Sequence, residues 1–376
     1  MTLPRERFTT PLIDVAAQRA RLGTRIDEAI ARVLDHGRFI LGPEVDVLEA
    51  GLAAATGARH AITCASGTDA LLLALLAHGI GRGDAVFVPA FTFPAAAEAA
   101  ALLGATPVFV DVEETYATLD PASLEAALRG LTGLRARAVV AVDLFGHTAD
   151  YDAIGRVARD RDMLVIADAA QSFGAASTSG EVGTLGDIAI TSFYPSKPLA
   201  CYGDGGCVFT ACDDAAAAVR SLRVHGQDTG GIFARIGING RLDTIQAAIL
   251  IEKLAICEEE RAARERIAAR YATALGNVVG IPRTAPGCRH AWACYTIRSP
   301  HRDAIDSALN QSGIATAVYY RTPLHRQPAY RGFGLAPEGA PVAERLATEV
   351  LSLPVHAYLD EATQDLIVER IRDVTG

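Results

Sequence analysis

The sequence predicts an α/β fold, with a mostly parallel sheet between helices, followed by a smaller α+β domain. From His60 onward, short apolar segments alternate with segments that have helical spacing. The apolar segments contain almost no polar residues, which is typical of parallel strands buried on both faces. The chain has 376 residues, more than one hydrophobic core usually supports, so two domains are expected.

Two helical segments precede the first expected strand. Residues 15–36 have helical spacing and are followed by Gly37, a residue type that often ends helices. A second helix is expected to begin at Pro43, because proline is favoured in a first turn, and to end before Gly57. Since both lie ahead of the sheet, we expect them to wrap around the second domain or a subunit interface.

Strands and helices then alternate through the central part of the chain. Mostly apolar runs predict strands at 61–64, 86–88, 107–111, 138–142, 163–167, 188–190 and 207–210. Helical spacing predicts helices at 71–78, 124–128, 151–161 and 213–224, with an alanine-rich helix before Gly104. In such sheets ligands bind beyond the carboxyl ends of the strands.

The remaining residues are expected to leave the sheet through one long helix, 242–275. Its charged run 258–261 is predicted to face solvent. Because a helix of this length often joins two domains, we place the boundary at Leu254, between a large domain (1–254) and a small domain (255–376). In the small domain we expect strands at 293–297 and 316–320 and helices at 303–311, 341–351 and 361–372.

Composition excludes several classes of protein. The net charge of -9 argues against a nucleic-acid scaffold and against binding to an anionic membrane. No apolar stretch reaches the roughly 18 residues of a membrane span, and residues 1–7 lack the apolar core of a signal peptide. A cytoplasmic protein is therefore expected. The seven cysteines form no C-x-x-C pair, which predicts reduced thiols and not a metal site or disulfides.

Lys197 lies in a loop between two expected strands. Pro195 and Pro198 stiffen the chain around it, and the glycine-rich segment Gly203–Gly206 allows close approach to a bulky group. A lysine held in this way suits a covalent imine with a carbonyl compound. The alternative is an ordinary surface lysine in a turn.

Asp168 ends an apolar strand. A carboxylate there is costly unless a cation balances it, and the protonated nitrogen of a pyridine ring is such a cation. A carboxylate in contact keeps that nitrogen protonated, so that the ring can accept electrons. The alternative is a helix-capping aspartate.

Ser66, Gly67 and Thr68 lie where a strand turns into a helix. The free amides of a helix N-terminus bind phosphate, and hydroxyl side chains add donors. The alternative is a simple helix cap by Ser66. The segment lacks the Gly-Lys-Ser/Thr ending of a Walker loop, and no G-x-G-x-x-G follows a strand.

Two further segments contain residues suited to such a ligand. Phe91 and Phe93 follow a strand and could stack on a flat ring, although aromatic residues are more often part of a core. Asn239 and Arg241 precede the long helix and could cap it or bind an anion. A phosphate site, a carboxylate for a ring nitrogen and an imine lysine, in this order at successive strand ends, together specify pyridoxal phosphate.

Five motifs in the same order resemble those of the nucleotide-sugar aminotransferases of the DegT/DnrJ type. They are Ser66–Leu71, Asp168–Ser172, Ser192–Pro198, Gly203–Gly206 and Asn239–Asp243. The resemblance extends from about Phe39 to the C-terminus. It implies a pyridoxal-phosphate-dependent aminotransferase of fold-type I, with a sheet of the seven-stranded type and a homodimer that shares its active sites.

The resemblance also implies roles for residues near the cofactor ring. Lys197 would form the imine with the cofactor and Asp168 would pair with the pyridine nitrogen. Gln171 would hold the ring hydroxyl, and Phe91 would stack on the ring.

Other matching residues would bind the phosphate and the sugar. Gly67, Thr68 and Ser192 would bind the cofactor phosphate. Asn239 would reach the phosphate from the partner subunit, and Arg241 would approach the sugar nucleotide from there.

Within the family the chain is most similar to the 3-aminotransferases of O-antigen synthesis. Those act on UDP-2-acetamido-3-keto-glucuronate, with L-glutamate as donor and 2-oxoglutarate as product. The segment containing Tyr202 is part of this similarity, which implies that Tyr202 binds the substrate. Where these enzymes have a His-Tyr pair near the sugar, this chain has Tyr319 and Tyr320. Since tyrosine brings no positive charge, neutral 3-keto or 4-keto sugars linked to UDP, dTDP or GDP remain alternative substrates.

Three other kinds of protein are alternatives to this interpretation. Relatives that replace the lysine with histidine are dehydratases, and the presence of Lys197 disfavours them. A non-catalytic sensor that binds the cofactor usually has a DNA-binding extension, and this chain has no basic patch. A decarboxylase or desulfurase is the third, although a desulfurase needs a cysteine on a mobile loop. The prediction is therefore transamination, first of the cofactor by glutamate and then of a keto sugar.

Overall fold

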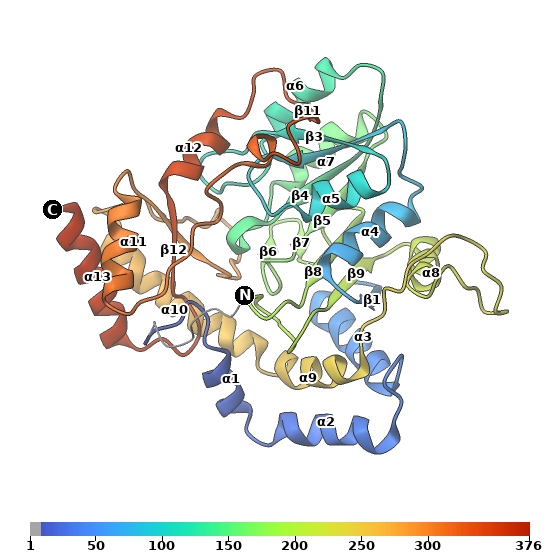
Figure 1. Cartoon of the computed structure of the whole chain (residues 1–376), viewed down its shortest axis with the longest axis horizontal. Helices are drawn as coiled ribbons and strands as arrows, with labels where there is room; N and C mark the ends of the chain where they lie inside the picture. Colours follow the sequence, from blue (N-terminus) through green and yellow to red (C-terminus); the bar gives the residue numbers. More distant parts are fainter. Residues whose placement is uncertain (1–8) are drawn as a thin grey trace.

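The computed structural model describes residues 9–376 and contains an eight-stranded sheet between two layers of helices (Figure 1). The strand order is β1 (His60–Cys64), β9 (Gly206–Thr210), β8 (Ile188–Ser192), β5 (Leu164–Asp168), β4 (Arg135–Val142), β2 (Asp84–Pro89), β3 (Thr106–Val110) and β11 (Gly334–Leu335). β9 runs antiparallel to both of its neighbours, whereas the other pairs are parallel. The predicted α/β fold with a mostly parallel sheet is confirmed.

The two faces of the sheet pack against different helices. One core contains residues of α4 (Gly67–Ala77), α5 (Ala95–Leu102), α8 (Asp213–Leu222) and α12 (Pro341–Glu349). The other contains residues of α3 (Pro43–Thr56), α6 (Pro121–Gly130), α7 (Tyr151–Arg159) and α9 (Thr244–Leu254). Successive residues of a strand point to opposite faces, so Val86 and Phe87 belong to different cores. This double cover explains why the strands are mostly apolar.

The N-terminal helices differ from the prediction in one respect. Residues 15–36 form two helices, α1 (Val15–Leu22) and α2 (Arg25–His36), and not one. Gly23 separates them with a φ of 57°, which is incompatible with a continuous helix. The helix from Pro43 ends before Gly57, as predicted. α2 and α3 both pack on α9, along the lower edge of the view in Figure 1.

The predicted long helix 242–275 is also two helices, α9 and α10 (Cys257–Leu275). Ile256 interrupts them with a φ of -112° and a ψ of 0°. The break lets α9 pack on the large sheet while α10 packs on a separate core. Within the charged run, Glu260 is only 3% exposed and accepts a 2.8 Å hydrogen bond from Gln18, so the prediction of a solvated face is wrong there.

The C-terminal part has its own core, which includes Tyr271, Tyr295 and Leu351. Its elements are a two-stranded antiparallel sheet of β10 (Tyr295–Arg298) and β12 (Val350–Leu353), with α11 (Arg302–Gln311) and α13 (Glu361–Thr375). The predicted strand 316–320 is wrong, because only Ala317 forms a bridge there, with Ser352. The predicted helix 341–351 ends at Glu349, and the apolar residues after it form β12.

The predicted boundary at Leu254 falls at the end of α9 and stays a prediction. β11, which follows this boundary in sequence, adds an eighth strand beside β3. It has two residues, too few for a recognisable pattern. The remaining short elements are β6 (Ala176–Ser177), β7 (Gly180–Glu181) and two single turns, η1 (Leu144–Gly146) and η2 (Leu324–Arg326). Between residues 9 and 376 no helix is long and apolar enough to cross a membrane.

Candidate active site

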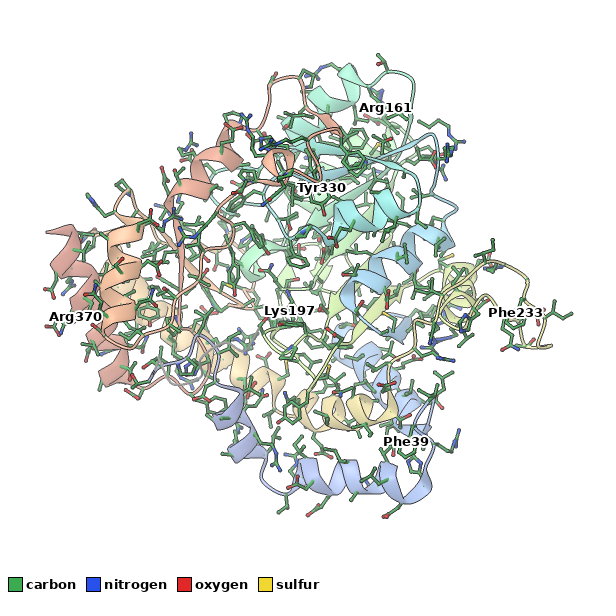
Figure 2. All side chains as sticks on the ribbon, in the orientation of Figure 1. Phe39, Arg161, Lys197, Phe233, Tyr330 and Arg370 are labelled. Atoms are coloured by element: carbon green, nitrogen blue, oxygen red, sulfur yellow. The ribbon has the colours of Figure 1, made fainter. Side chains whose placement is uncertain are left out.

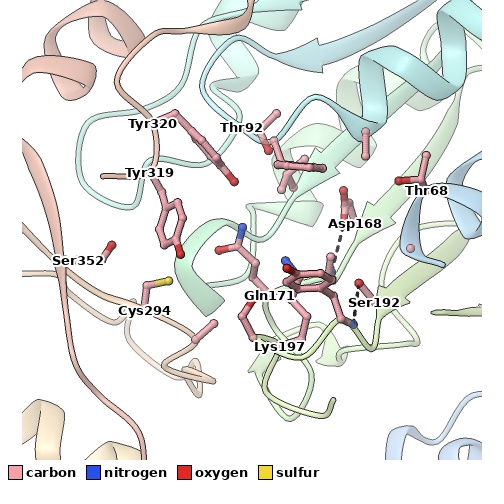
Figure 3. A pocket seen from close by; sticks show the side chains of 18 of the residues that line it. Thr68, Thr92, Asp168, Gln171, Ser192, Lys197, Cys294, Tyr319, Tyr320 and Ser352 are labelled. Atoms are coloured by element: carbon pink, nitrogen blue, oxygen red, sulfur yellow. Dashed lines mark hydrogen bonds between the residues drawn. The ribbon is translucent and has the colours of Figure 1, made fainter. Parts of the chain in front are cut away.

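A cavity of about 570 Å³ lies beyond the carboxyl ends of the parallel strands (Figure 3). Its walls come from the ends of β1, β2, β5 and β8, from the loop that carries Lys197, and from the C-terminal part of the chain. Leu12 and Ile13 close it from the N-terminal side. In Figure 2, Lys197 lies near the centre of the molecule, between the large sheet and the C-terminal helices.

Asp168 and Lys197 meet at this cavity. Asp168 is the last residue of β5 and is 6% exposed. Within residues 9–376, one group donates to its carboxylate, the N–H of Ala170 at 3.0 Å. Burial raises the pKa of Asp168, and the charge of Lys197 opposes that rise. Burial lowers the pKa of Lys197, and Asp168 opposes that fall. The pair therefore consists of a carboxylate with unused lone pairs and an amine that loses its proton more easily than usual.

The loop geometry positions the amine. The backbone N–H of Lys197 donates to the carbonyl of Tyr194 at 2.8 Å, which forms a turn after β8. The end of the loop is hydrogen-bonded to its start, because the N–H of Cys201 donates to the carbonyl of Phe193 at 2.8 Å. Proline on both sides of Lys197 limits the backbone further.

The start of α4 faces the same cavity. Ser66 caps this helix, and its Oγ accepts from the N–H of Asp69 at 3.0 Å, so the predicted cap exists. The first amides of a helix have no acceptor within it, so those of Gly67 and Thr68 are available for a ligand. A Cβ on Gly67 would lie 2.7 Å from the Cβ of Ser192, so only glycine lets the turn approach β8 this closely. Gly67, Thr68 and Ser192 all line the cavity.

Gln171 lines the cavity three residues after the end of β5 and is 9% exposed. Its Oε1 accepts a hydrogen bond from the N–H of Phe145 at 2.9 Å. The amide oxygen is thereby used within the protein, and the amide nitrogen is the group that remains for a ligand.

The structure corrects the prediction for the aromatic residues after β2. Phe91 is fully buried and does not line the cavity, whereas Phe93 lines it and is 54% exposed. Phe91 instead meets the edge of Tyr320, with 6.1 Å between ring centroids. The segment between β2 and α5 is a turn without strand periodicity, so the sequence does not indicate which of the two rings faces a ligand. The ring available for stacking is therefore Phe93.

Tyr319 and Tyr320 form the wall that comes from the C-terminal part, together with Cys294 and Ser352. Burial raises the pKa of Tyr319 to about 12 and that of Cys294 to about 11, so both groups stay protonated at neutral pH. Among the described residues that line the cavity, Lys197 has the only cationic side chain. This wall therefore offers hydroxyl donors to a substrate.

Besides Phe91, three residues predicted to bind cofactor or substrate lie outside this cavity. The ring of Tyr202 packs under Lys253, with 4.1 Å from Nζ to the ring centroid, and beside a small core that contains Leu22. Asn239 is exposed and accepts a hydrogen bond from Arg241. The assignment of Asn239 and Arg241 to the cavity of a partner subunit stays a prediction, as does the role of Tyr202 in substrate binding.

Several lining residues were not found from the sequence, namely Thr92, Tyr194, Ser196, Asp204, Cys294 and Ser352. They lie next to predicted residues or in segments that return to the cavity from far along the chain. Thr92, Tyr194, Ser196 and Asp204 belong to segments that the sequence had already singled out. Cys294 and Ser352 had no signal, because their approach depends on the pairing of β10 with β12.

The donor set fits pyridoxal phosphate. The carboxylate of Asp168, which has unused lone pairs, suits a protonated ring nitrogen. The amine of Lys197 suits the aldehyde, and Phe93 can stack on a face of the ring. The open N-terminus of α4 and the hydroxyl of Ser192 suit the phosphate. No cluster of potential metal ligands occurs in the part of the chain described here.

Comparison with known proteins agrees with this fit. The sequence profile of the DegT/DnrJ/EryC1/StrS aminotransferase family matches residues 20–372. The chain is 47% identical over 358 residues to a UDP-2-acetamido-2-deoxy-3-oxo-D-glucuronate aminotransferase from Pseudomonas aeruginosa, covering 94% of this chain and 97% of that enzyme. It is 42% identical over 352 residues to a UDP-N-acetyl-3-dehydro-alpha-D-glucosamine 3-aminotransferase from Acidithiobacillus ferrooxidans, covering 93% of this chain and 94% of that enzyme.

A solved structure is similar over almost the whole length. The crystal structure of a DegT DnrJ EryC1 StrS aminotransferase from Brucella abortus superposes with a TM-score of 0.95 and 48% sequence identity. The match covers 97% of this chain and 99% of that one.

Proposed function

This chain belongs to the DegT/DnrJ/EryC1/StrS aminotransferase family, and from that premise we propose that it aminates C3 of a UDP-linked 2-acetamido-3-keto-hexuronate with L-glutamate as donor. It is a sugar aminotransferase, and its cofactor is pyridoxal phosphate. One observation carries the proposal: Asp168, Lys197 and the open start of α4 line one cavity in a chain 47% identical to a 3-oxo-glucuronate aminotransferase.

The residues of the chain divide the work of the reaction. When bound, pyridoxal phosphate supplies an aldehyde that accepts an amino group and a ring that accepts electrons. Burial lowers the pKa of Lys197, so its Nζ gives up a proton more easily than an exposed lysine does. This Nζ would take a proton from the α-carbon of glutamate and, in the second half of the reaction, would give a proton to the sugar carbon that receives the amino group. General acid–base catalysis of this kind contributes about 10²–10⁴-fold in rate. Asp168 would keep the proton on the ring nitrogen, and Gly67, Thr68 and Ser192 would hold the phosphate.

We further propose a homodimer with shared active sites. Residues 226–240, which we call the arm, project from the body of the protein, and Figure 2 shows Phe233 at the tip. Ile232 and Phe233 are each 66% exposed, and Ile236 is 92% exposed. Apolar side chains this exposed favour an interface. A partner subunit would also account for Asn239 and Arg241, which lie outside the cavity of their own chain.

The resemblance to the O-antigen enzymes supports a proposal about the place and the pathway of the reaction. We place the reaction in the cytoplasm, where its product would serve the synthesis of a surface polysaccharide. The family membership and the sugar aminotransferases among its relatives do not support the alternative of a non-catalytic sensor.

The experiment that tests this proposal has two steps. The purified protein is first mixed with L-glutamate, and the absorbance of the cofactor is expected to change to that of the amino form. A 3-keto sugar nucleotide with a carboxylate at C6 is then added, and mass spectrometry is expected to find the 3-amino product. If glutamate leaves the spectrum unchanged, or if no amine forms, the proposal is wrong.

A second candidate substrate is the neutral 3-keto sugar UDP-N-acetyl-3-dehydro-glucosamine. It is favoured by the wall of Tyr319 and Tyr320, which brings hydroxyl groups and no cation, and by the 42% identity to an enzyme of that specificity. The value of kcat/KM for the acidic and the neutral keto sugar separates the two candidates. A higher value for the neutral sugar would replace the first proposal by the second.

A further inference from the structure

Asp143 is a buried carboxylate that the reaction described above does not use. It directly follows β4 and is fully buried, next to the end of β5. Its carboxylate accepts three hydrogen bonds, from Ser172 Oγ at 2.6 Å, from the Tyr151 hydroxyl at 2.7 Å and from the Ala149 N–H at 2.8 Å. Because these donors surround it, Asp143 acts on other protein groups and not on a ligand.

Two of the contacts of Asp143 tie it to the strand end beside the cavity. Its backbone N–H donates to the carbonyl of Asp168 at 3.0 Å. Its carboxylate holds Ser172, the residue that directly follows Gln171. The turn from Asp168 to Ser172, which contains two residues that line the cavity with polar side chains, is therefore attached to Asp143 at both ends.

The turn that begins at Asp143 reaches Gln171 by a second route. Phe145 has a φ of 61°, in the left-handed region, and this directs its N–H to Gln171 Oε1 at 2.9 Å. Gly146 follows with a φ of 103°, and a Cβ there would lie 2.9 Å from the nitrogen of Ala293 and 3.1 Å from the carbonyl oxygen of Gln171. The two turns are thus in direct contact, with no room for a side chain between them.

The contact with Phe145 decides which end of the Gln171 amide faces the cavity. A backbone N–H needs an acceptor, and the NH₂ group of glutamine cannot be one. If the amide were rotated by half a turn, its NH₂ group would face the N–H of Phe145, and two donors would meet without an acceptor. The NH₂ group therefore faces the cavity, where a hydrogen bond involving Gln171 also lowers the pKa of Tyr320 against the effect of burial. A donor in this place suits an oxygen atom on a ring.

We propose that Asp143 is a positioning residue for the cofactor: by holding the Gln171–Ser172 turn against the Phe145–Gly146 turn, it makes the Gln171 side chain present its NH₂ group to an oxygen on the cofactor ring. The inference rests on the proposed function, because the ligand is pyridoxal phosphate. It adds to that function a role for Asp143, which lies outside the cavity and determines that the NH₂ group of Gln171 faces into it.

A matched pair of variants tests the first part of this proposal. Ser172→Ala and Tyr151→Phe each remove one hydroxyl donor from Asp143, but only Ser172 is part of the turn that contains Gln171. The affinity of the apoprotein for pyridoxal phosphate is measured by absorbance titration, and thermal unfolding is measured in parallel. Both variants are expected to lower Tm. Ser172→Ala is expected to weaken cofactor binding about tenfold, and Tyr151→Phe less than about threefold. Equal affinities in the two variants would overturn the proposal.

A second pair tests the direction of the amide without disturbing Asp143. Gln171→Glu keeps an oxygen for the N–H of Phe145 but presents a second oxygen to the cavity, whereas Gln171→Met presents no polar atom. At pH 8 the affinity for pyridoxal phosphate is expected to be about tenfold lower in Gln171→Glu than in Gln171→Met, because two oxygen acceptors repel. If Gln171→Glu binds as tightly as Gln171→Met or more tightly, the inference is wrong. Failure of the wild-type apoprotein to bind the cofactor would instead overturn the proposed function, so the two failures are distinguishable.

Discussion

Neighbouring strands β4 and β5 end at aspartates that have opposite surroundings. Asp143, after β4, has its carboxylate enclosed by three donors from the protein. Asp168, the last residue of β5, has one backbone donor and faces Lys197 across the cavity. Both are buried, and burial raises the pKa of both. The difference lies in what balances the charge, since hydrogen bonds do so for Asp143 and a cation does so for Asp168.

The comparison shows how a protein assigns two roles to one residue type. A buried carboxylate costs free energy unless donors or a cation balance it. Where the protein supplies the donors itself, the carboxylate holds segments together. Where it leaves lone pairs unused beside a cavity, the carboxylate is available to a ligand. Four predictions sharpen or break this comparison, in order of decreasing expected effect.

The largest effect is expected from removing the cation that Asp168 faces and Asp143 does not. Lys197→Ala deletes the amine that we propose exchanges protons, so kcat should fall by about 10⁴-fold, the upper end for general acid–base catalysis. The chain contains only one other lysine, Lys253, which packs on Tyr202 outside the cavity. Lys253→Arg keeps that charge and serves as the control, with kcat expected to stay within about threefold. Measurable turnover of Lys197→Ala near the wild-type rate would contradict the assignment.

The second prediction compares the two carboxylates directly. Asp168→Asn removes the charge that balances a protonated ring nitrogen, and loss of one partner of a buried pair costs about 3–5 kcal/mol. This corresponds to about a 10²–10⁴-fold lower kcat/KM. Asp143→Asn keeps the shape and most of the hydrogen bonds, so its kcat/KM should fall less than about tenfold. Steady-state kinetics of both variants decide the matter, and equal losses would show that the comparison is wrong.

The third prediction concerns pH. Burial raises the pKa of Asp143 to about 7, from 3.8 when it is exposed in the unfolded chain. Between these values the folded protein holds a proton that the unfolded chain releases. The contribution of Asp143 to the free energy of unfolding therefore falls as pH rises from about 4 to about 7, by up to about 1.4 kcal/mol per pH unit. Asparagine does not titrate, so Asp143→Asn should gain stability relative to the wild type over this range.

Urea unfolding of both apoproteins at pH 5, 6 and 7 measures this effect. The titratable groups that act on Asp143, Tyr151 and Asp168, are present in both proteins, so their own pH dependence largely cancels in the difference. Parallel curves for the two proteins would mean that Asp143 does not take up a proton in this range.

The smallest effect is expected from the aromatic pair after β2, which repeats the same contrast between a side chain used by the protein and one left for a ligand. Phe93→Ala should weaken binding of pyridoxal phosphate by about 2–10-fold, since an aromatic stacking pair contributes about 0.5–1.5 kcal/mol. Phe91→Leu, in the core, should lower Tm and leave the affinity unchanged. Absorbance titration of the apoproteins with the cofactor provides the measurement. Loss of affinity in Phe91→Leu alone would return the stacking role to Phe91.

The sequence was sufficient wherever the signal is local. Apolar runs identified the strands of the large sheet except β11, because a strand buried on both faces consists mostly of apolar residues. Glycines at 37 and 57 marked helix ends. Motif order also identified Asp168, Gln171, Ser192 and Lys197, which the fold brings to one cavity because parallel strands end at the same edge of the sheet.

Where the outcome depends on direction or on distant partners, the sequence was not sufficient. Helical spacing continues through residues 255–256, so nothing local shows that α9 and α10 pack on different cores. Residues 350–353 extend the apolar pattern of α12 but become a strand, because β10 offers them a partner.

The sequence by itself therefore determined the α/β class, the order of most elements and the chemical groups at the strand ends. Only the tertiary structure decided that Phe93 and not Phe91 faces the cavity, that Tyr202 does not, and that Asp143 is enclosed while Asp168 is open. The physical reason is that residue type and spacing specify local conformation, whereas the balance of a buried charge depends on donors that arrive from elsewhere in the chain.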